Sequence, residues 1–251
     1  MTCLTLTPAS VAEAIAGRAQ LVIVHHPLPF KPLAKITTET YAGRLLWELA
    51  KSGISVYSPH TAWDSAARGI NARLADMLGL DNVVPLVPAD PNRWPGLGTG
   101  RRGELPHPLS PFEIARQLGD ALPECRPRVV LPEPSSGSGG GSNSVGSTGT
   151  GSPRPENLIR KVAICCGSGG SLLAAAVASE CDLFLTGEGT FHTCLEAQAA
   201  RISLLMIGHF ASERFAMEQL ANELAGEYPP LAVWASKSEK DPVRNCDLGS
   251  I

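Results

Sequence analysis

Most histidines of the chain, together with several carboxylates, come directly after segments that have the pattern of β-strands. These residues are His25 and His26 after 20–24, His60 and Asp64 after 54–58, Glu188 and His192 after 181–187, and His209 and Glu213 after 202–208. In open α/β sheets, ligands bind beyond the carboxyl ends of the strands. Imidazole and carboxylate groups together suit borderline divalent metals such as zinc, iron, manganese or nickel. Because such residues follow four of the expected strands, the sequence predicts a metal site.

The spacing within two of these groups supports the same chemistry. His209 and Glu213 stand four residues apart, so on a helix they share one face and can hold one ion together. A glutamate has two oxygens and is able to bridge two metals. His25 and His26 are adjacent at the end of an apolar strand, and Pro27 stops that strand. The two imidazoles can therefore diverge toward two nearby ions.

Each pattern also has a structural interpretation. A single histidine after a strand is more often a structural residue than a ligand, and His107, between two prolines, is assigned to a loop.

The turn "GSGG" lacks the spacing of a dinucleotide-binding loop and the Lys-Ser/Thr of a P-loop. Its backbone N–H groups at Gly167, Gly169 and Gly170 are instead candidates for binding an anionic small-molecule substrate. The adjacent thiols of Cys165 and Cys166 are interpreted as buried filler.

Strand-like and helix-like segments alternate along the chain, which predicts an α/β fold with mostly parallel sheets covered by helices. Expected strands are 2–7, 20–24, 54–58, 161–166, 181–187, 202–208 and 231–236. Expected helices are 8–19, 37–53, 69–80, 111–122 with Ser110 as its N-cap, 167–179, 190–201 and 212–226. A Ser/Gly-rich stretch interrupts this order and predicts a flexible linker over 133–155. The expected domains are an N-terminal lobe over 1–132 and a C-terminal lobe over 156–251.

Composition narrows the class of protein. The net charge of −3 and the pI of about 6.1 give no reason to expect nucleic-acid binding through bulk charge. No apolar run approaches the length of a membrane span. The seven cysteines are scattered and form no CxxC pair, which favours free thiols in a reducing cytoplasm.

Several blocks of sequence occur in the order found in one known family. They read "IVHHPLPFKPLAKIT", "VYSPHTAWDSAARGINARLA", "GLGTGRRGEL", "VAICCGSGGSLL", "LTGEGTFH" and "IGHFASER". The chain thus resembles the NIF-three-like family, which is catalogued as homologous to a second type of GTP cyclohydrolase I. The resemblance implies two α/β lobes that face one cleft, a dinuclear metal centre in that cleft, and a homohexamer.

The resemblance also implies roles for particular residues. The implied metal ligands are His25, His26, Asp64, His209 and Glu213, with Glu213 as the bridge between two divalent ions. His60 and His192 match family histidines near the site, where they would support the ligands or transfer protons.

The chain departs from the family pattern in three places. The family has a helix and a "WDNxGL" segment before its first strand, whereas this chain begins at that strand. Thr5 stands where many members have aspartate. Some relatives carry an extra α/β domain between the lobes, where this chain has the Ser/Gly-rich stretch.

These observations lead to a metal-dependent hydrolase that acts through a metal-bridging hydroxide as the first hypothesis. A non-catalytic protein that binds or delivers metal would use the same ligands, and a protein-interaction scaffold is a further alternative. Ring opening of GTP is the least supported activity because nothing in the sequence recognises guanine.

Overall fold

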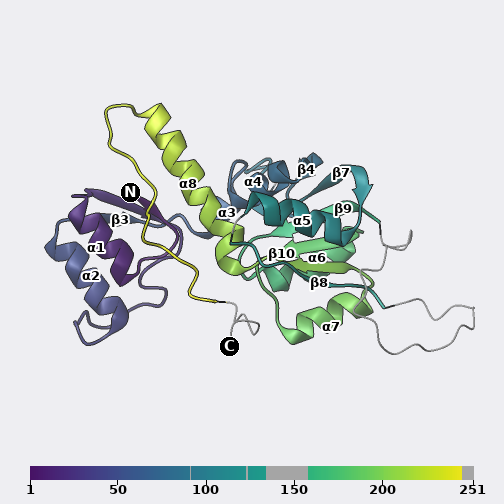
Figure 1. The fold of residues 1–251 in the computed structure, drawn as a ribbon, viewed down its shortest axis with the longest axis horizontal. Coiled ribbons are helices and arrows are strands. Elements are labelled where there is room, and N and C mark those ends of the chain that lie inside the picture. The colour runs from purple at the N-terminus through teal and green to yellow at the C-terminus, as the bar shows by residue number, and fades with distance from the viewer. Residues whose placement is uncertain (91, 123, 134–157, 245–251) are drawn as a thin grey trace, which may run out of the picture.

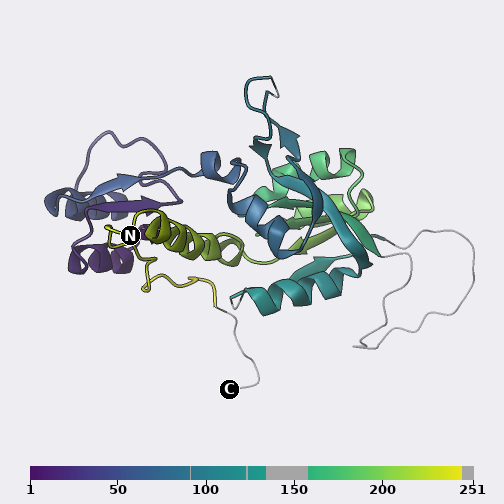
Figure 2. The ribbon, with the colours of Figure 1, turned by 90° about the horizontal axis from the view of Figure 1, so that it is seen from above.

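A computed structural model describes residues 1–90, 92–122, 124–133 and 158–244. Nearly all of the expected linker over 133–155 lies outside these residues. The described chain forms a smaller lobe and a larger lobe, and the last long helix extends from the larger lobe to the smaller one (Figures 1 and 2).

The smaller lobe is built on a three-stranded parallel sheet. Its strands are β1 (Thr2–Cys3), β2 (Leu21–Val24) and β3 (Ser55–Tyr57), in that spatial order. Helices α1 (Pro8–Ala16) and α2 (Tyr41–Lys51) connect the strands and supply apolar side chains to the core of this lobe. The strands and helices of this lobe follow one another in the order that the sequence pattern predicted.

Local sequence signals fix where the helices begin. The Thr7 side chain caps α1, and Pro8 occupies the first turn, where its missing N–H costs nothing. The Thr40 side chain caps α2, so this helix begins four residues later than the expected start at residue 37. Ser110 caps α5 (Pro111–Ala121) and forms a capping box with Glu113, which confirms the expected cap.

The larger lobe contains a six-stranded sheet in the order β4-β7-β9-β10-β11-β8. The strands are β4 (Asp81–Val84), β7 (Arg101–Leu109), β9 (Ile159–Cys165), β10 (Leu183–Thr186), β11 (Ser203–Met206) and β8 (Arg128–Val130). The three central strands β9, β10 and β11 are parallel, and β4, β7 and β8 add to them in antiparallel pairs. Two short strands, β5 (Val87–Pro88) and β6 (Gly98–Thr99), pair separately.

Helices cover both faces of this sheet, so the central strands are buried on both sides. Leu183 and Leu185 of β10 belong to one core cluster, and Phe184 belongs to the other. The first cluster includes residues of α4 (Ile70–Met77), α5 and α8 (His209–Glu227). The second includes residues of α6 (Leu173–Ala178) and α7 (Phe191–Ala199). A short 3-10 turn, η2 (Gly169–Leu172), leads into α6, and α3 (Thr61–Asp64) follows β3.

The α/β class is as expected, but the boundary between the lobes is not. Strands β4, β7 and β8 precede the linker, yet they share one sheet with β9, β10 and β11, which follow it. The division into 1–132 and 156–251 therefore cuts through a sheet. Residues up to β3 form the smaller lobe, which also packs against Trp234 near the end of the chain. Strand pairing joins distant segments, and local sequence patterns carry no record of it.

Two further expectations need correction. The expected loop around His107 is part of β7, where the register is irregular between Glu104 and Leu109. Prolines are tolerated in such irregular stretches because no ladder N–H is required there. The expected strand over 231–236 is reduced to one isolated bridge between Thr2 and Ala235.

Among the described residues, none of the helices combines the length and the apolar character needed to pass through a membrane.

Candidate metal centre

The end of β2 places two histidines at the edge of the smaller sheet. His25 and His26 follow Val24, and their backbone N–H groups donate to the carbonyl oxygens of Cys3 and Leu4 at 3.1 and 2.9 Å. The hydroxyl of Ser58, after β3, donates to the His25 carbonyl at 2.8 Å. These bonds hold both histidines beside the carboxyl ends of the parallel strands, as expected for a ligand site.

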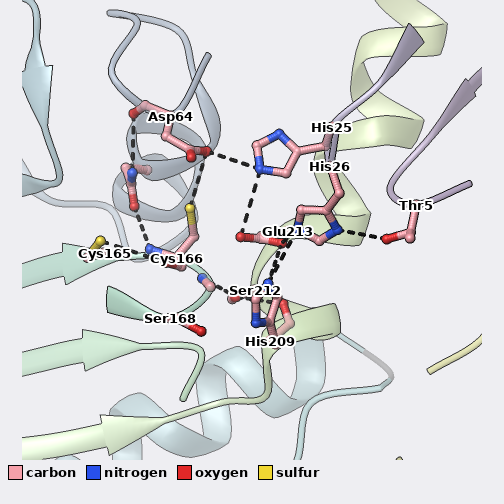
Figure 3. Close-up of polar contacts among 12 residues, drawn as sticks. Thr5, His25, His26, Asp64, Cys165, Cys166, Ser168, His209, Ser212 and Glu213 are labelled. Carbon is pink, nitrogen blue, oxygen red and sulfur yellow. Dashed lines mark hydrogen bonds and ion pairs between the residues drawn. The ribbon is translucent and has the colours of Figure 1, made fainter. Parts of the chain in front are cut away.

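Two other segments bring the remaining ligands to the same place (Figure 3). His60 precedes α3 with φ 41° and ψ −125°, a backbone conformation that is rare outside glycine, and Asp64 ends that short helix. His209 opens α8 after the two residues that follow β11, and Glu213 lies one turn further along α8. The site therefore combines residues of the smaller lobe, the connection that follows it, and the larger lobe.

Glu213 lies at the centre of this group. Its Oε2 is 3.0 Å from Nε2 of His26 and 3.2 Å from Nε2 of His209. Its Oε1 is 3.9 Å from Nε2 of His25, and the same nitrogen is 3.6 Å from Oδ1 of Asp64. The two oxygens of one carboxylate thus face imidazoles on opposite sides.

The possible ligand atoms form two overlapping sets. The nitrogens of His25, His26 and His60 lie within 4.8 Å of one another, and so do the ligand atoms of His26, His209 and Glu213. The ligand atom of His60 therefore lies within the same 4.8 Å limit as the ligand atoms of the expected ligands.

The ring of His25 provides a test of whether a metal fits these residues. His25 is fully buried, and neither of its ring nitrogens has a hydrogen-bond partner. Burial lowers the pKa of His25 to about 4, so the ring is neutral near pH 7 and keeps a lone pair. Buried polar atoms without partners are costly and call for an explanation. A metal ion bound between His25 and the nearby carboxylates would supply a partner for Nε2, the ring nitrogen that lies near them.

The charges of the other groups depend on one another. Burial opposes ionisation of Glu213, but hydrogen bonds with His209 and His26 outweigh it and lower the pKa of Glu213 to about 2. The same contact with Glu213 raises the pKa of His209 to about 9, against the effect of burial. Burial and the charge of Glu213 raise the pKa of Asp64 to about 7. Burial also lowers the pKa of His60.

Two residues outside the expected ligand set hold the ligands in place. Oε1 of Glu188 lies 2.9 Å from Nδ1 of His209, and Glu188 also accepts a hydrogen bond from the Ser168 hydroxyl. Oγ1 of Thr5 lies 2.7 Å from Nδ1 of His26. A histidine that binds metal with one nitrogen usually bonds a polar group through the other. The position of Glu188 directly after the expected strand over 181–187 was a usable signal in the sequence, whereas the role of Thr5 was visible only in the fold.

The glycine-rich turn lies against the site, but its role differs from the expected one. Gly167 has φ +60°, and a Cβ at this position would lie 2.3 Å from Oε1 of Glu213. Its N–H donates to the hydroxyl of Ser212 at 2.9 Å, and the N–H of Gly169 donates to Thr186 at 3.1 Å. These two N–H groups therefore hold the turn together and are not free to bind an anionic substrate.

Gly170 lies away from the cluster of ligands. A Cβ at this position would meet the side chain of Thr193 on α7, with the Thr193 hydroxyl 3.3 Å away. The glycine therefore permits the close packing of the turn against α7.

His192 does not join the cluster. It is exposed on α7, and its ring centroid lies 6.1 Å from that of its neighbour Phe191.

The cysteine thiols are also poor ligands here, since burial raises the pKa of Cys165 to about 12 and that of Cys166 well above its usual value. Sγ of Cys166 contacts Oδ1 of Asp64 at 3.5 Å, in keeping with a packing role.

Comparison with known proteins gives consistent matches along the chain. The family model described as Duf34/NIF3 (NGG1p interacting factor 3) matches residues 1–242. A "NIF3-like protein 1" of Drosophila melanogaster is 32% identical over 239 residues, which are 95% of this chain and 73% of the relative. A "GTP cyclohydrolase 1 type 2 homolog" of Streptomyces coelicolor is 34% identical over 206 residues, 81% of this chain. The match spans 65% of that relative, so the chain is shorter than both proteins.

Solved structures show the same fold. A Bacillus cereus protein related to NIF3 superposes with a TM-score of 0.77 and 19% identity, covering 98% of this chain and 88% of the other. The protein ybgI, described as of unknown function, superposes with a TM-score of 0.72 and 26% identity, covering 94% and 82%.

Proposed function

Because the chain belongs to the Duf34/NIF3 family and gathers imidazoles and carboxylates between its lobes, we propose that it binds two divalent metal ions and hydrolyses a small-molecule substrate. The observation that carries the proposal is the ring of His25, which is buried without a hydrogen-bond partner within reach of two carboxylates. The family membership supports the proposal but names no substrate.

The geometry of Glu213 supports two ions over one. Its Oε1 faces His25 and its Oε2 faces His26 and His209, so each oxygen has its own imidazole partners. One ion would be held by His25, Asp64 and Glu213, with His60 close by. The other would be held by His26, His209 and Glu213. Zinc, iron, manganese and nickel all accept such a set of ligands.

Divalent ions held in this way acidify a water molecule and polarise the bond that is to be hydrolysed. The protein's own groups would orient the substrate and handle protons around them. Glu188 holds Nδ1 of His209, which keeps the other ring nitrogen directed at Glu213. The side chains of His26 and His209 are 24% and 34% exposed, whereas His25 is buried, so a substrate would approach from the side of His26 and His209.

The proposal is tested in two steps. Elemental analysis of the purified protein, before and after dialysis against a chelator, shows whether divalent metal is bound and how many ions are present. Phosphoester, amide and nucleotide substrates are then screened with each metal form and with the metal-free protein. Failure to take up metal in titration would refute the metal site itself.

A second function uses the same residues. The partial exposure of two of the ligand histidines favours exchange of the ions with solvent, which suits a protein that stores or delivers metal. Rapid transfer of metal to a chelator, with no turnover in any metal form, would favour delivery over hydrolysis.

A further inference from the structure

The segment that follows α8 returns to the smaller lobe and brings one carboxylate against the backbone of Leu4 and Thr5. The side chain of Glu239 is only 2% exposed. It accepts hydrogen bonds from the backbone N–H groups of Leu4 at 2.9 Å and Thr5 at 2.7 Å. Nε of Arg214 lies 3.0 Å from the same carboxylate. A buried carboxylate with three such partners is strongly constrained in position.

The two residues that Glu239 holds are the same two that hold His26. The backbone N–H of His26 donates to the carbonyl of Leu4 at 2.9 Å, and Nδ1 of its ring lies 2.7 Å from Oγ1 of Thr5. The other ring nitrogen, Nε2, is 3.0 Å from Glu213. The position of the His26 ring is therefore set by a chain of contacts that begins at the far end of the sequence (Figure 3 shows the Thr5 contact).

We propose that Glu239 and Thr5 act as a positioning relay, in which Glu239 fixes the backbone at Thr5 and the Thr5 hydroxyl fixes the ring of His26 with Nε2 toward the metal site. The inference rests on the proposed metal binding, and it gives a role in that binding to two residues outside the ligand set. A hydroxyl both donates and accepts hydrogen bonds. The Thr5 hydroxyl can therefore accept a hydrogen bond from Nδ1–H of His26, and this tautomer leaves the lone pair of Nε2 free for a metal.

The alternative is that Glu239 only fastens the end of the chain to the protein. A second carboxylate in the same region fastens the same segment. Glu13 accepts hydrogen bonds from the N–H groups of Lys237 and Ser238 and from the hydroxyls of Ser236 and Ser238. In the part of the chain that the structure describes, no hydrogen bond or ion pair joins Glu13 to Thr5 or His26. Glu13→Gln is therefore a matched control that loosens the same segment without breaking the relay.

The experiment titrates metal-free protein with Co²⁺ and follows the absorption of the bound ion. Thr5→Val keeps the shape of the side chain but removes the hydroxyl, and Glu239→Gln removes the charge that holds Thr5. Both are expected to weaken Co²⁺ binding by about 10- to 100-fold, the range typical for groups that orient metal-binding histidines. Thr5→Ser restores the hydroxyl and should bind as the parent protein does. Glu13→Gln should lower the melting temperature while leaving the affinity unchanged.

A second measurement needs no metal. The ¹⁵N shifts of the His26 ring in the metal-free protein report which nitrogen carries the proton, and Thr5→Val should change them while Thr5→Ser should not. If Thr5→Val alters neither Co²⁺ affinity nor the ring signals, the relay is refuted. If the parent protein takes up no metal, the proposed function fails, and the ring signals still decide the relay. The Thr5 variants leave Glu239 intact, so they decide the matter even if Glu239→Gln does not fold.

Discussion

Oε2 of Glu213 lies 3.0 Å from Nε2 of His26, although Glu213 belongs to α8 and His26 follows a strand of the smaller lobe. This contact joins the two lobes through groups that are also metal ligands by type. Because each lobe supplies only part of the ligand set, metal affinity should depend on residues of both lobes.

Removing the charge of Glu213 should abolish most metal binding. Glu213→Gln keeps the size of the side chain but takes away the anion that faces three imidazoles, so we expect affinity to fall by more than about 100-fold, beyond the range seen for residues that only orient ligands. Titration of the metal-free protein measures this. Glu218→Gln on the same helix is the control, because Glu218 is 65% exposed and, among the described residues, its ion pair is with Arg214. Equal affinity of the two variants would contradict a ligand role for Glu213.

Metal binding should release protons, and the number should depend on pH. In the metal-free protein His209 has a pKa of about 9 and Asp64 a pKa of about 7, so both bind protons that a metal must displace. Between these two pKa values one proton should be released, from His209. Below the pKa of Asp64 a second proton should follow, and affinity should fall more steeply as pH falls. Calorimetric titration in buffers of different ionisation enthalpy counts the protons, and pH-independent binding would contradict the assignment.

The two histidines that the sequence placed near the site should behave differently. The nitrogens of His60 lie among those of His25 and His26, whereas His192 is exposed on α7. His60→Ala should lower the affinity for one of the ions by about 10-fold or more, since groups next to a metal typically contribute this much. His192→Ala should leave metal content unchanged. Elemental analysis of both variants after equal dialysis makes the comparison, and loss of metal in His192→Ala would show that the histidine reaches the site in solution.

Gly167→Ala should disturb the site through backbone strain and collision. The residue has φ +60°, and the new Cβ would lie 2.3 Å from a Glu213 oxygen, so a loss of roughly 1–3 kcal/mol in stability is expected together with weaker metal binding. Gly119→Ala in α5 is the control. Apart from its neighbours and the backbone of its own helix, no described atom lies within 4 Å of a Cβ at that position, so the change should stabilise the helix by about 0.5–1 kcal/mol. Thermal and denaturant unfolding compare the two, and equal stability would argue against close contact at Gly167.

The shared sheet predicts how the chain responds to a cut in the segment 133–155. Strand β7 pairs with β9, and β8 pairs with β11, so each half alone lacks the neighbours of its edge strands. Fragments 1–132 and 156–251 should be largely unfolded when produced separately and should assemble when produced together. Circular dichroism and co-purification test this. If the two fragments fold independently, the expected division into domains 1–132 and 156–251 is correct.

The sequence by itself determined most of the helices, the central strands and the chemical types at the strand ends. Periodicity and capping are local properties, so α1, α5 and the three central strands of the larger sheet could be read directly. The ligand residues could be proposed for a related reason, because parallel strands must bring their carboxyl ends to one edge. Strand β7 was missed since its charges and prolines give no strand pattern.

Only the tertiary structure decided how these elements and side chains meet. It placed strands from both sides of the Ser/Gly-rich stretch in one sheet, turned the two oxygens of Glu213 toward different imidazoles, and left His192 on the surface. It also brought Glu239 into hydrogen-bond contact with Thr5, although the two residues lie near opposite ends of the sequence. Contacts between distant segments depend on the packing of whole lobes, whereas propensity and spacing record only what lies within a few residues.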